Sequence, residues 1–337
     1  MPGPEEKTRT WRRSLRRTEP SLKPDANRGY SLPRLPRMDF VLPEFLRSMW
    51  VSDEARLRWQ PRIESISSAW REMEWLTVVE GVRPCVLCRV STDGWSELQN
   101  RSKKQGLTVV PLMVQRSMSR ASAAANPSAM IMRAVIGRRR DAKRFARAWA
   151  NLDSAEAGAL LGYPECCCRF FADAMRQSAD QEMLWTVAAR SYTTGAESRL
   201  LRVDGHPELN IFWRYLGVKA VPHIPCNLNC ADSLRLAEQF AGVGRSAGQK
   251  DAIAWTSEIL RWPLEWSVLH GIAEMKTPIV KLCTNSVATR SRFTIRKSGS
   301  GYPEDGARGV DFPFQQQTAV RTSRFTDGLN IIYGTGQ

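Results

Sequence analysis

The chain of 337 residues is 42% hydrophobic, which is enough for one large domain or two smaller ones with a real core. No apolar run approaches the ~18 residues that a membrane helix needs, and no apolar segment follows the N-terminal arginine pairs. We therefore expect a cytoplasmic protein with no membrane partner, and the formal charge of +15 favours nucleic acid or small anions as partners.

Residues 1–40 carry six prolines and no helical or strand periodicity, which predicts a disordered basic arm. They hold ten Lys and Arg against five Asp and Glu, a net charge of +5. The remaining +10 is spread over the body of the chain. A basic tail alone is a weak indication of function, so the charge leaves nucleic-acid binding open.

Residues 41–152 are predicted to form an α/β domain. Apolar residues at spacings of three and four make 41–80 helical, with a break at Pro61. Strands are then expected at 84–91, 107–114 and 129–137, and helices at 93–106 and 140–152. This alternation is typical of a β–α–β unit. The fold class is therefore α/β, with a small parallel or mixed sheet in the N-terminal region.

Residues 153–282 are predicted to form a mostly helical domain that carries a metal site. Asp153 and Glu156 form a helix start that resembles a capping box, and Pro164 begins the next helix. Further helices are expected at about 226–243, 249–262 and 264–278. The C-terminal segment, 283–337, shows short strands and Gly-rich turns.

Five of the eight cysteines fall in two short segments, GYPECCCRFF (162–171) and HIPCNLNC (223–230). In a reducing cytoplasm, clustered thiols bind metal or do chemistry more often than they form disulfides. Cys166 and Cys167 follow a helix-starting proline, where the helix dipole favours thiolate. Cys226 and Cys230 are four apart, which places both sulfurs on one face of a helix. We expect these four cysteines to hold one metal centre, with His223 beside it or as a replacement ligand.

Four thiolates suit either tetrahedral zinc or an iron–sulfur cluster. The adjacent pair in the first segment favours the cluster, because its separate irons can each take one sulfur. Core packing is the competing interpretation, since free cysteine is among the most buried residue types. We prefer it for Cys168, which hardly reaches the same centre, and for Cys85 and Cys88, which strand alternation points to opposite faces. Cys283 stays open.

The pattern GYPECC-x-x-F, followed by H-x-PC-x-x-x-C-x-x-S, resembles a prokaryotic family of unknown function, DUF483. The later segment LEWSVLHGIAEMKTP is similar to the same family. The resemblance covers about 155–280, and the cysteine motifs are its specific part. It implies that Cys166 and Cys167 are the matching pair, and that Cys168 stands where the family has an apolar residue. It implies no particular reaction.

A second group of ionisable residues lies in the apolar segment LEWSVLHGIAEMK. If this segment is helical, His270 and Glu274 share a face, as acid–base pairs do. We predict that it lines a pocket beside the metal, with Glu265 or His270 as the general base. Lys276 would bind the anionic group of a small substrate. The alternative is a helix with one polar face.

The leading hypothesis from the sequence is a cytoplasmic iron–sulfur enzyme of biosynthesis or sulfur transfer, either a lyase or a transferase. The first alternative is a nucleic-acid-binding protein with structural zinc, which the charge favours; the second is a metal-free thiol enzyme. The basic cluster that suits nucleic acid, but equally suits a solvated helix face, comprises Arg133, Arg138, Arg139, Arg140, Lys143, Arg144 and Arg147. The sequence does not predict the oligomeric state.

Overall fold

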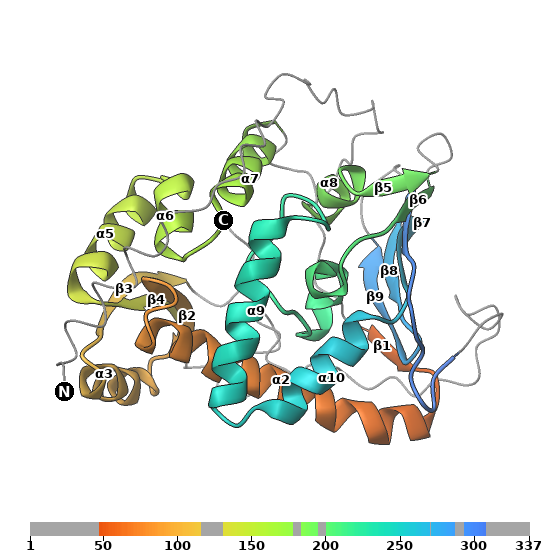
Figure 1. Cartoon of the computed structure of the whole chain (residues 1–337), viewed down its shortest axis with the longest axis horizontal. Coiled ribbons are helices and arrows are strands. Elements are labelled where there is room, and N and C mark those ends of the chain that lie inside the picture. The colour runs from red at the N-terminus through yellow and green to blue at the C-terminus, as the bar shows by residue number, and fades with distance from the viewer. Residues whose placement is uncertain are drawn as a thin grey trace, which may run out of the picture. The chain divides into compact units, whose positions relative to one another are not determined.

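Two β-sheets, with helices packed on them, form the part of the chain that this computed structural model describes (Figure 1). The described residues are 47–115, 131–177, 183–194, 200–269, 271–286 and 293–307. They all fall in the unit Arg34–Gln337, whereas the unit Met1–Pro33 and the basic arm predicted at 1–40 lie outside them. Within the described residues, no helix is both long and apolar enough to cross a membrane.

The smaller sheet has three strands in the order β2-β4-β3. These strands are β2 (Cys85–Ser91), β3 (Thr108–Gln115) and β4 (Ile131–Gly137). β4 pairs antiparallel with both neighbours, so β2 and β3 run in the same direction without pairing. All three strands were expected from the sequence. The position of β4 between the other two distinguishes this sheet from the simplest β–α–β unit.

Helices cover both faces of the smaller sheet. On one face Val135 of β4 shares a core cluster with Phe145, and on the other face Ile136 shares a cluster with Trp75. Neighbouring residues of a strand point to opposite faces, so β4 connects the two clusters. The helices involved are α3 (Trp95–Lys104), α5 (Arg139–Ala150), α6 (Ser154–Leu160) and the end of α2 (Asp53–Val79).

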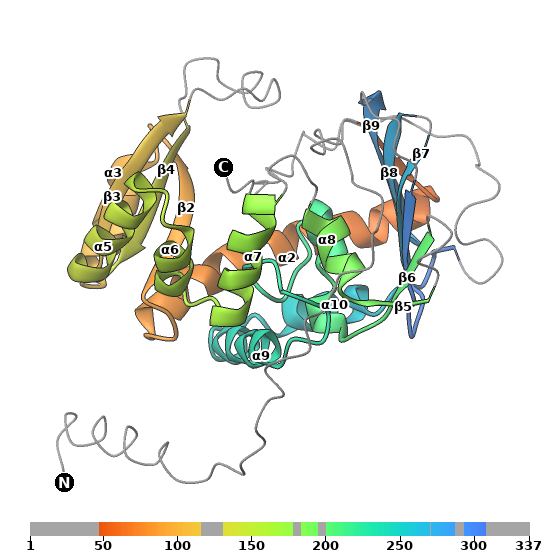
Figure 2. The same ribbon diagram turned by 90° about the horizontal axis from the view of Figure 1, so that it is seen from above.

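The long helix α2 contacts both sheets (Figure 2). Ser52 caps its start by accepting a hydrogen bond from the N–H of Ala55, and its buried face includes Trp59 and Ile63. The predicted break at Pro61 is wrong, because the helix runs through the proline. A proline inside a helix costs about 3 kcal/mol, and burial of the continuous apolar face of α2 offsets that cost.

The larger sheet has seven strands in the order β1-β9-β8-β7-β10-β6-β5. β6 and β10 pair in parallel and the other neighbours pair antiparallel, so this sheet is mixed. Helices lie on one side of it (Figure 2). The strands are β1 (Arg47–Trp50), β5 (Tyr192–Thr194), β6 (Leu200–Val203), β7 (Leu264–Leu269), β8 (Ile272–Lys276), β9 (Val280–Ser286) and β10 (Phe293–Lys297).

The segment 264–278 contains the hairpin β7–β8, so the helix predicted there is wrong. Leu269 pairs with Ile272, and the two-residue connection between them includes Gly271 at φ +73°. Trp266 and Val268 are fully buried and alternate with more polar residues. That period of two, with glycine in a two-residue turn, is typical of a hairpin.

The core beside the larger sheet is rich in tryptophan. Five indole rings are almost completely buried there: Trp59, Trp185, Trp213, Trp262 and Trp266. The helices that contribute to this region are α7 (Glu165–Gln177), α8 (Met183–Ala189), α9 (Ala231–Ser246) and α10 (Lys250–Leu260), with short 3-10 helices at Pro207–Leu209 and Ile211–Leu216. The predicted class is confirmed, an α/β protein with a small N-terminal sheet and a helical region that carries the cysteines. The strands of the small sheet, however, pair antiparallel and not in the parallel or mixed arrangement expected from the sequence.

Candidate metal centre

The first cysteine segment begins a helix, as the sequence predicts. Asp153 caps the preceding helix α6 by accepting a hydrogen bond from the N–H of Glu156. Gly162 follows the end of α6 with φ +73°, a conformation that favours glycine. Helix α7 comes next, and Cys166 and Cys167 lie in its first turn. The chain therefore presents two neighbouring thiols at a helix N-terminus.

The second cysteine segment is not the helix start that the sequence suggested. Helix α9 begins only at Ala231, with Cys230 as its N-cap, and Cys226 lies in the loop before it. The side chain of Asn227 accepts a hydrogen bond from the N–H of Asn229 at 2.8 Å. Such a local bond competes with helix formation, and the loop it stabilises brings both thiols toward α7.

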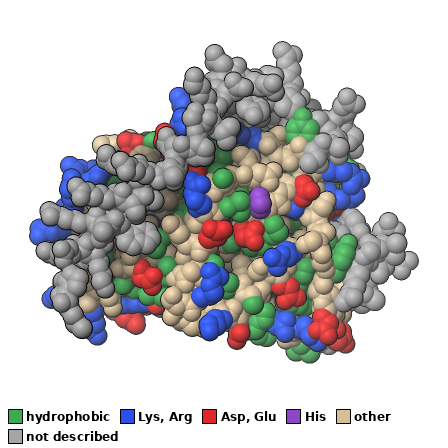
Figure 3. All heavy atoms as spheres, in the orientation of Figure 1, with side chains coloured by type: hydrophobic (Ala, Val, Ile, Leu, Met, Phe, Trp, Pro, Cys, Tyr) green, Lys and Arg blue, Asp and Glu red, His purple; other side chains and the backbone are tan. Residues whose placement is uncertain are grey.

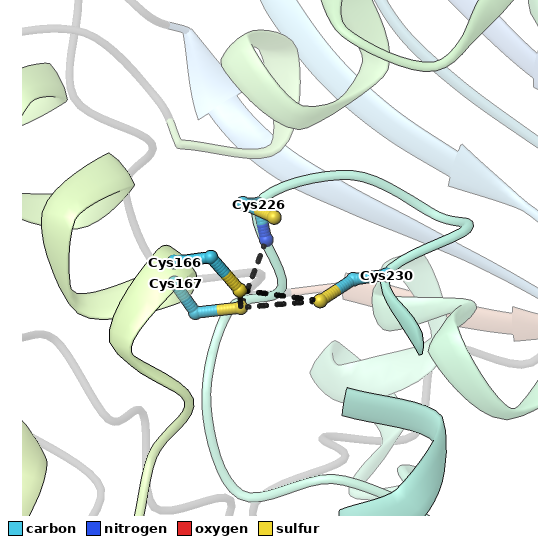
Figure 4. A group of neighbouring side chains, drawn as sticks. All are labelled: Cys166, Cys167, Cys226 and Cys230. Atoms are coloured by element: carbon cyan, nitrogen blue, oxygen red, sulfur yellow. Dashed lines mark hydrogen bonds between the residues drawn. The ribbon is translucent and has the colours of Figure 1, made fainter. Parts of the chain in front are cut away.

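Four sulfurs meet between these two helix starts (Figure 4). The Sγ atom of Cys230 lies 3.6 Å from that of Cys166 and 3.7 Å from that of Cys167, and the latter two are 3.8 Å apart. With the sulfur of Cys226 included, all four lie within 4.8 Å of one another. Cys166 is half-buried and the other three are buried. The structure thus brings together the four cysteines expected to hold a metal, and we call them the sulfur group.

The thiols of the sulfur group have pKa values shifted in different directions. Hydrogen bonds from Cys167 and Cys226 hold the pKa of Cys230 well below its usual range. Hydrogen bonding with Cys226 and Cys230 raises the pKa of Cys167, while burial raises the pKa of Cys166 to about 12. Four thiolates at these distances would repel one another strongly. Complete ionisation of the group therefore requires a cation between the sulfurs.

Several contacts of the sulfur group favour negative charge, although the thiol of Cys166 also donates to the Asp232 carboxylate at 3.6 Å. The N–H of Cys226 donates to Sγ of Cys167 at 3.3 Å, and the hydroxyl of Ser233 lies 3.3 Å from the same sulfur. The side-chain amide of Asn227 donates to Sγ of Cys226 at 3.5 Å. α7 and α9 both direct their N-termini at the group, and each such end is equivalent to roughly half a positive charge. A divalent cation with four thiolates carries a net charge of −2, which these contacts offset in part.

His223 reaches the sulfur group through Ser233. Its Nε2 atom lies 2.8 Å from the Ser233 hydroxyl, and its ring packs against Tyr163 with centroids 5.1 Å apart. Burial lowers the pKa of His223 to about 4, so the imidazole is neutral at pH 7. Ser233 ends the pattern H-x-PC-x-x-x-C-x-x-S but was not among the site residues predicted from the sequence. Ser233 lies three residues after the N-cap Cys230, and a side chain at that position in the first turn can reach back to the N-cap residue. This spacing could have indicated a contact between Ser233 and the cysteines.

Three other cysteines lie apart from the sulfur group. Sγ of Cys168 contacts the backbone oxygen of Tyr163 at 3.7 Å, and a Cβ at Gly158 would lie only 2.6 Å from that sulfur. Glycine at 158 therefore makes room for the Cys168 side chain. Cys85 and Cys88 join different core clusters on the two faces of the smaller sheet. The core interpretation agrees with the clusters that hold Cys85 and Cys88, whereas Cys168 is half-buried and its core interpretation stays a prediction.

The predicted catalytic residues Glu265 and Lys276 belong to an ion-pair network across the larger sheet. Nζ of Lys276 lies 3.4 Å from one carboxylate oxygen of Glu265, and Arg296 donates to the other at 2.6 and 3.1 Å. Glu274 extends the network to Lys276 at 3.6 Å and to Lys281 at 2.6 Å. We call these five residues the sheet network; three cations and two carboxylates satisfy one another within it.

The sheet network and the sulfur group lie on different sides of β7. Trp266 alternates with Glu265 along the strand and belongs to the core cluster that also holds Cys167. Glu265 therefore points away from that cluster. His270 lies outside the described residues, and the predicted helical pairing of His270 with Glu274 is wrong because Glu274 lies on β8. The catalytic roles of Glu265, His270 and Lys276 stay predictions.

Comparison with known proteins identifies one family. Residues 140–243 match the family model described as "Protein of unknown function (DUF483)". Over these residues the chain is similar to the DUF483 family, and we call them the DUF483 segment. The DUF483 segment runs from α5 into α9 and includes the whole sulfur group, so the family resemblance expected from the sequence is confirmed. The match covers less than a third of the chain. No curated protein and no solved structure matches this chain.

Proposed function

We propose that this protein binds a single zinc ion through Cys166, Cys167, Cys226 and Cys230. The observation that carries the proposal is the sulfur spacing, 3.6 to 3.8 Å for three pairs. Zinc–sulfur bonds of about 2.3 Å at tetrahedral angles separate the sulfurs by about 3.8 Å. The spacing of these three sulfurs therefore matches what one tetrahedral ion requires, and the sulfur of Cys226 lies within 4.8 Å of each of them.

The rival hypothesis from the sequence, an iron–sulfur cluster, requires wider spacing. In a four-iron cluster each cysteine binds a different iron and its bond points outward, so the sulfurs stand roughly 6 Å apart. All four sulfurs here lie within 4.8 Å of one another. This supports one ion over a cluster, and with it a structural or regulatory metal over the predicted lyase or transferase chemistry.

The metal-free thiol enzyme is the other alternative. It requires a thiolate that a substrate can reach. The thiol whose pKa is lowered belongs to Cys230, which is only 6% exposed and whose sulfur faces three other thiols. That arrangement suits a ligand better than a nucleophile.

The proposed role of the ion is structural. Four protein ligands leave no coordination position for a substrate, which is typical of structural zinc. The ligands come from the start of α7 and from the loop that leads into α9. Zinc would therefore fasten these two helix starts together within the DUF483 segment, and its binding free energy would contribute directly to folding.

Metal and sulfide analysis of anaerobically purified protein tests the proposal. We expect a colourless protein with one zinc per chain and no acid-labile sulfide. Cys167→Ala and Cys226→Ala should each lose the ion, whereas Cys168→Ala should retain it, because its sulfur lies apart from the group. A brown protein that contains iron and sulfide would contradict the proposal, as would full zinc retention by both ligand variants.

A further inference from the structure

Helix α5 carries a dense group of exposed positive charges. Its apolar side packs on the smaller sheet through Ala142, Phe145 and Ala148, and its opposite side is basic. We define the basic face of α5 as the exposed residues Arg138, Arg139, Arg140, Lys143 and Arg147. Lys and Arg side chains gather along the left edge of Figure 3, the side on which α5 lies in Figure 1.

No carboxylate that the structure describes neutralises this face. Among the described residues, none of its five side chains forms an ion pair, whereas Arg144 on the flank of the helix pairs with Glu156. The acidic residue of the first turn, Asp141, is half-buried rather than exposed. Within the described part of the chain, the basic face therefore presents five positive charges to solvent without an ion-pair partner.

The arrangement of these charges opposes helix stability. Arg139 and Arg140 stand in the first turn, where the helix dipole disfavours cations, and the N-cap Arg138 makes no side-chain cap. Lys143 is four residues from both Arg139 and Arg147, and like charges at that spacing repel. Charges placed against both rules are explained when an anionic partner lies over them.

The spacing of the basic face fits a regular array of phosphates. Four residues of helix advance by about 6 Å, so Arg139, Lys143 and Arg147 span about 12 Å in a line. Phosphates along one strand of a duplex follow one another at about 3.4 Å of axis, so charges about 6 Å apart are spaced for about every second phosphate. We propose that the basic face of α5 binds the phosphate backbone of a nucleic acid, through charge and without reading base sequence.

The chemistry of α5 favours nucleic acid over a lipid surface. Helices that bind membranes insert large apolar side chains such as Trp, Phe or Leu. The aromatic residues of α5, Phe145 and Trp149, instead stack on each other with centroids 5.9 Å apart and pack against the protein core. The side chains that remain exposed on the helix are the basic face and Ala150.

Binding of a labelled 20-base-pair DNA duplex and a 20-nucleotide single-stranded RNA by the zinc-loaded full chain tests the proposal. About four phosphate contacts predict a slope of log affinity against log salt of about −3 to −4 for the duplex. Affinity should then fall on the order of 100-fold between 50 and 200 mM salt. Replacing Arg139, Arg140, Lys143 and Arg147 by Gln should weaken binding at least tenfold at 50 mM salt and flatten the slope.

A matched variant removes the same charge elsewhere. Arg71, Arg245, Lys250 and Arg261 are also exposed, and their replacement by Gln should weaken binding much less. Replacing the three α5 arginines of the test variant by Lys keeps the charge and should keep the affinity. Zinc content should be unchanged throughout, which separates this proposal from the metal proposal.

Three outcomes would overturn the proposal. The first is equal binding by the α5 and matched variants. The second is no salt-dependent binding of either nucleic acid by the native chain. The third is tighter binding of phosphatidylserine vesicles or polyglutamate than of nucleic acid, which would assign the face to a lipid surface or an acidic protein.

Discussion

The sheet network and the sulfur group both bury ionisable side chains, but their charges are balanced differently. The sheet network places two carboxylates between three cations, so the charges of its own side chains stabilise one another. The sulfur group gathers four acids of the same kind within 4.8 Å, and no ion pair of the described residues includes any of them. The charges of the sheet network therefore stabilise one another without a ligand, whereas we propose that a cation balances the sulfur group.

The difference shows how a ligand site can be recognised from its electrostatics. Both groups are largely buried and both contain ionisable residues, so burial and composition alone do not distinguish them. The sign of the neighbouring charges does. Opposite signs point to a structural network, and several acidic groups held close together point to a cation site.

The largest expected effect is the loss of one ligand. Cys230→Ala should abolish stoichiometric zinc binding and lower the free energy of unfolding by about 3 kcal/mol or more, because metal binding contributes to folding. Cys283→Ala is the matched change beside the sheet network, where Sγ lies 3.7 Å from Glu274. It should keep the zinc and cost about 1 kcal/mol. Metal analysis and thermal unfolding check both, and equal effects would remove the distinction between the two groups.

The next effect is in the sheet network itself. Glu265→Gln leaves Arg296 and Lys276 without their shared carboxylate and should cost about 2 to 3 kcal/mol in denaturant unfolding. Because Glu265 points away from the core cluster of Cys167, zinc content should not change. Loss of zinc in this variant would show that the two groups are coupled.

A smaller effect is expected at the hydroxyl beside the sulfurs. Ser233→Ala removes the link between Cys167 and His223 and should weaken zinc binding by about 10- to 100-fold, as loss of a group that orients a ligand does. Ser102→Ala also removes a buried hydroxyl, which donates to the Leu98 carbonyl at 2.8 Å, far along the chain from the sulfurs. Competition with a zinc chelator should separate the variants; equal affinities would mean that Ser233 has no role at the metal.

The smallest expected change in the free energy of unfolding is at residues outside both groups, and the larger changes can be compared with it. Leu152 is 91% exposed and has φ +57°, a backbone conformation that costs a non-glycine residue about 1 kcal/mol. Leu152→Gly should therefore raise the free energy of unfolding slightly. Leu57→Gly should lower it by about 1 kcal/mol, because exposed Leu57 lies inside α2. Thermal unfolding compares the two, and a shared sign would contradict the backbone argument.

Local signals in the sequence predicted some of this structure well. Pro164 and the cap at Asp153 fix helix starts through contacts a few residues apart, so the placement of Cys166 and Cys167 followed from them. The start of α9 was missed because the Asn227 turn competes with the helix expected from Cys226. The four ligand candidates were nevertheless found, since their grouping along the chain did not depend on that helix.

Long-range pairing was beyond these local signals. The segment 264–278 has apolar residues that satisfy both a helical and a strand period, and pairing of β7 with β8 and β10 decides between them. The place of β4 between β2 and β3 is likewise set by the assembled sheet. Pro61 stays helical because the buried face of α2 outweighs the local preference.

X-ray absorption at the metal edge tests the central claim most directly, because it measures the distances that the sulfur spacing implies. We predict a zinc edge with one shell of four sulfurs at about 2.3 Å and no metal–metal distance. Cys168→Ala should give the same spectrum. An iron edge with iron–iron scattering at roughly 2.7 Å, as a cluster produces, would contradict the single-ion account.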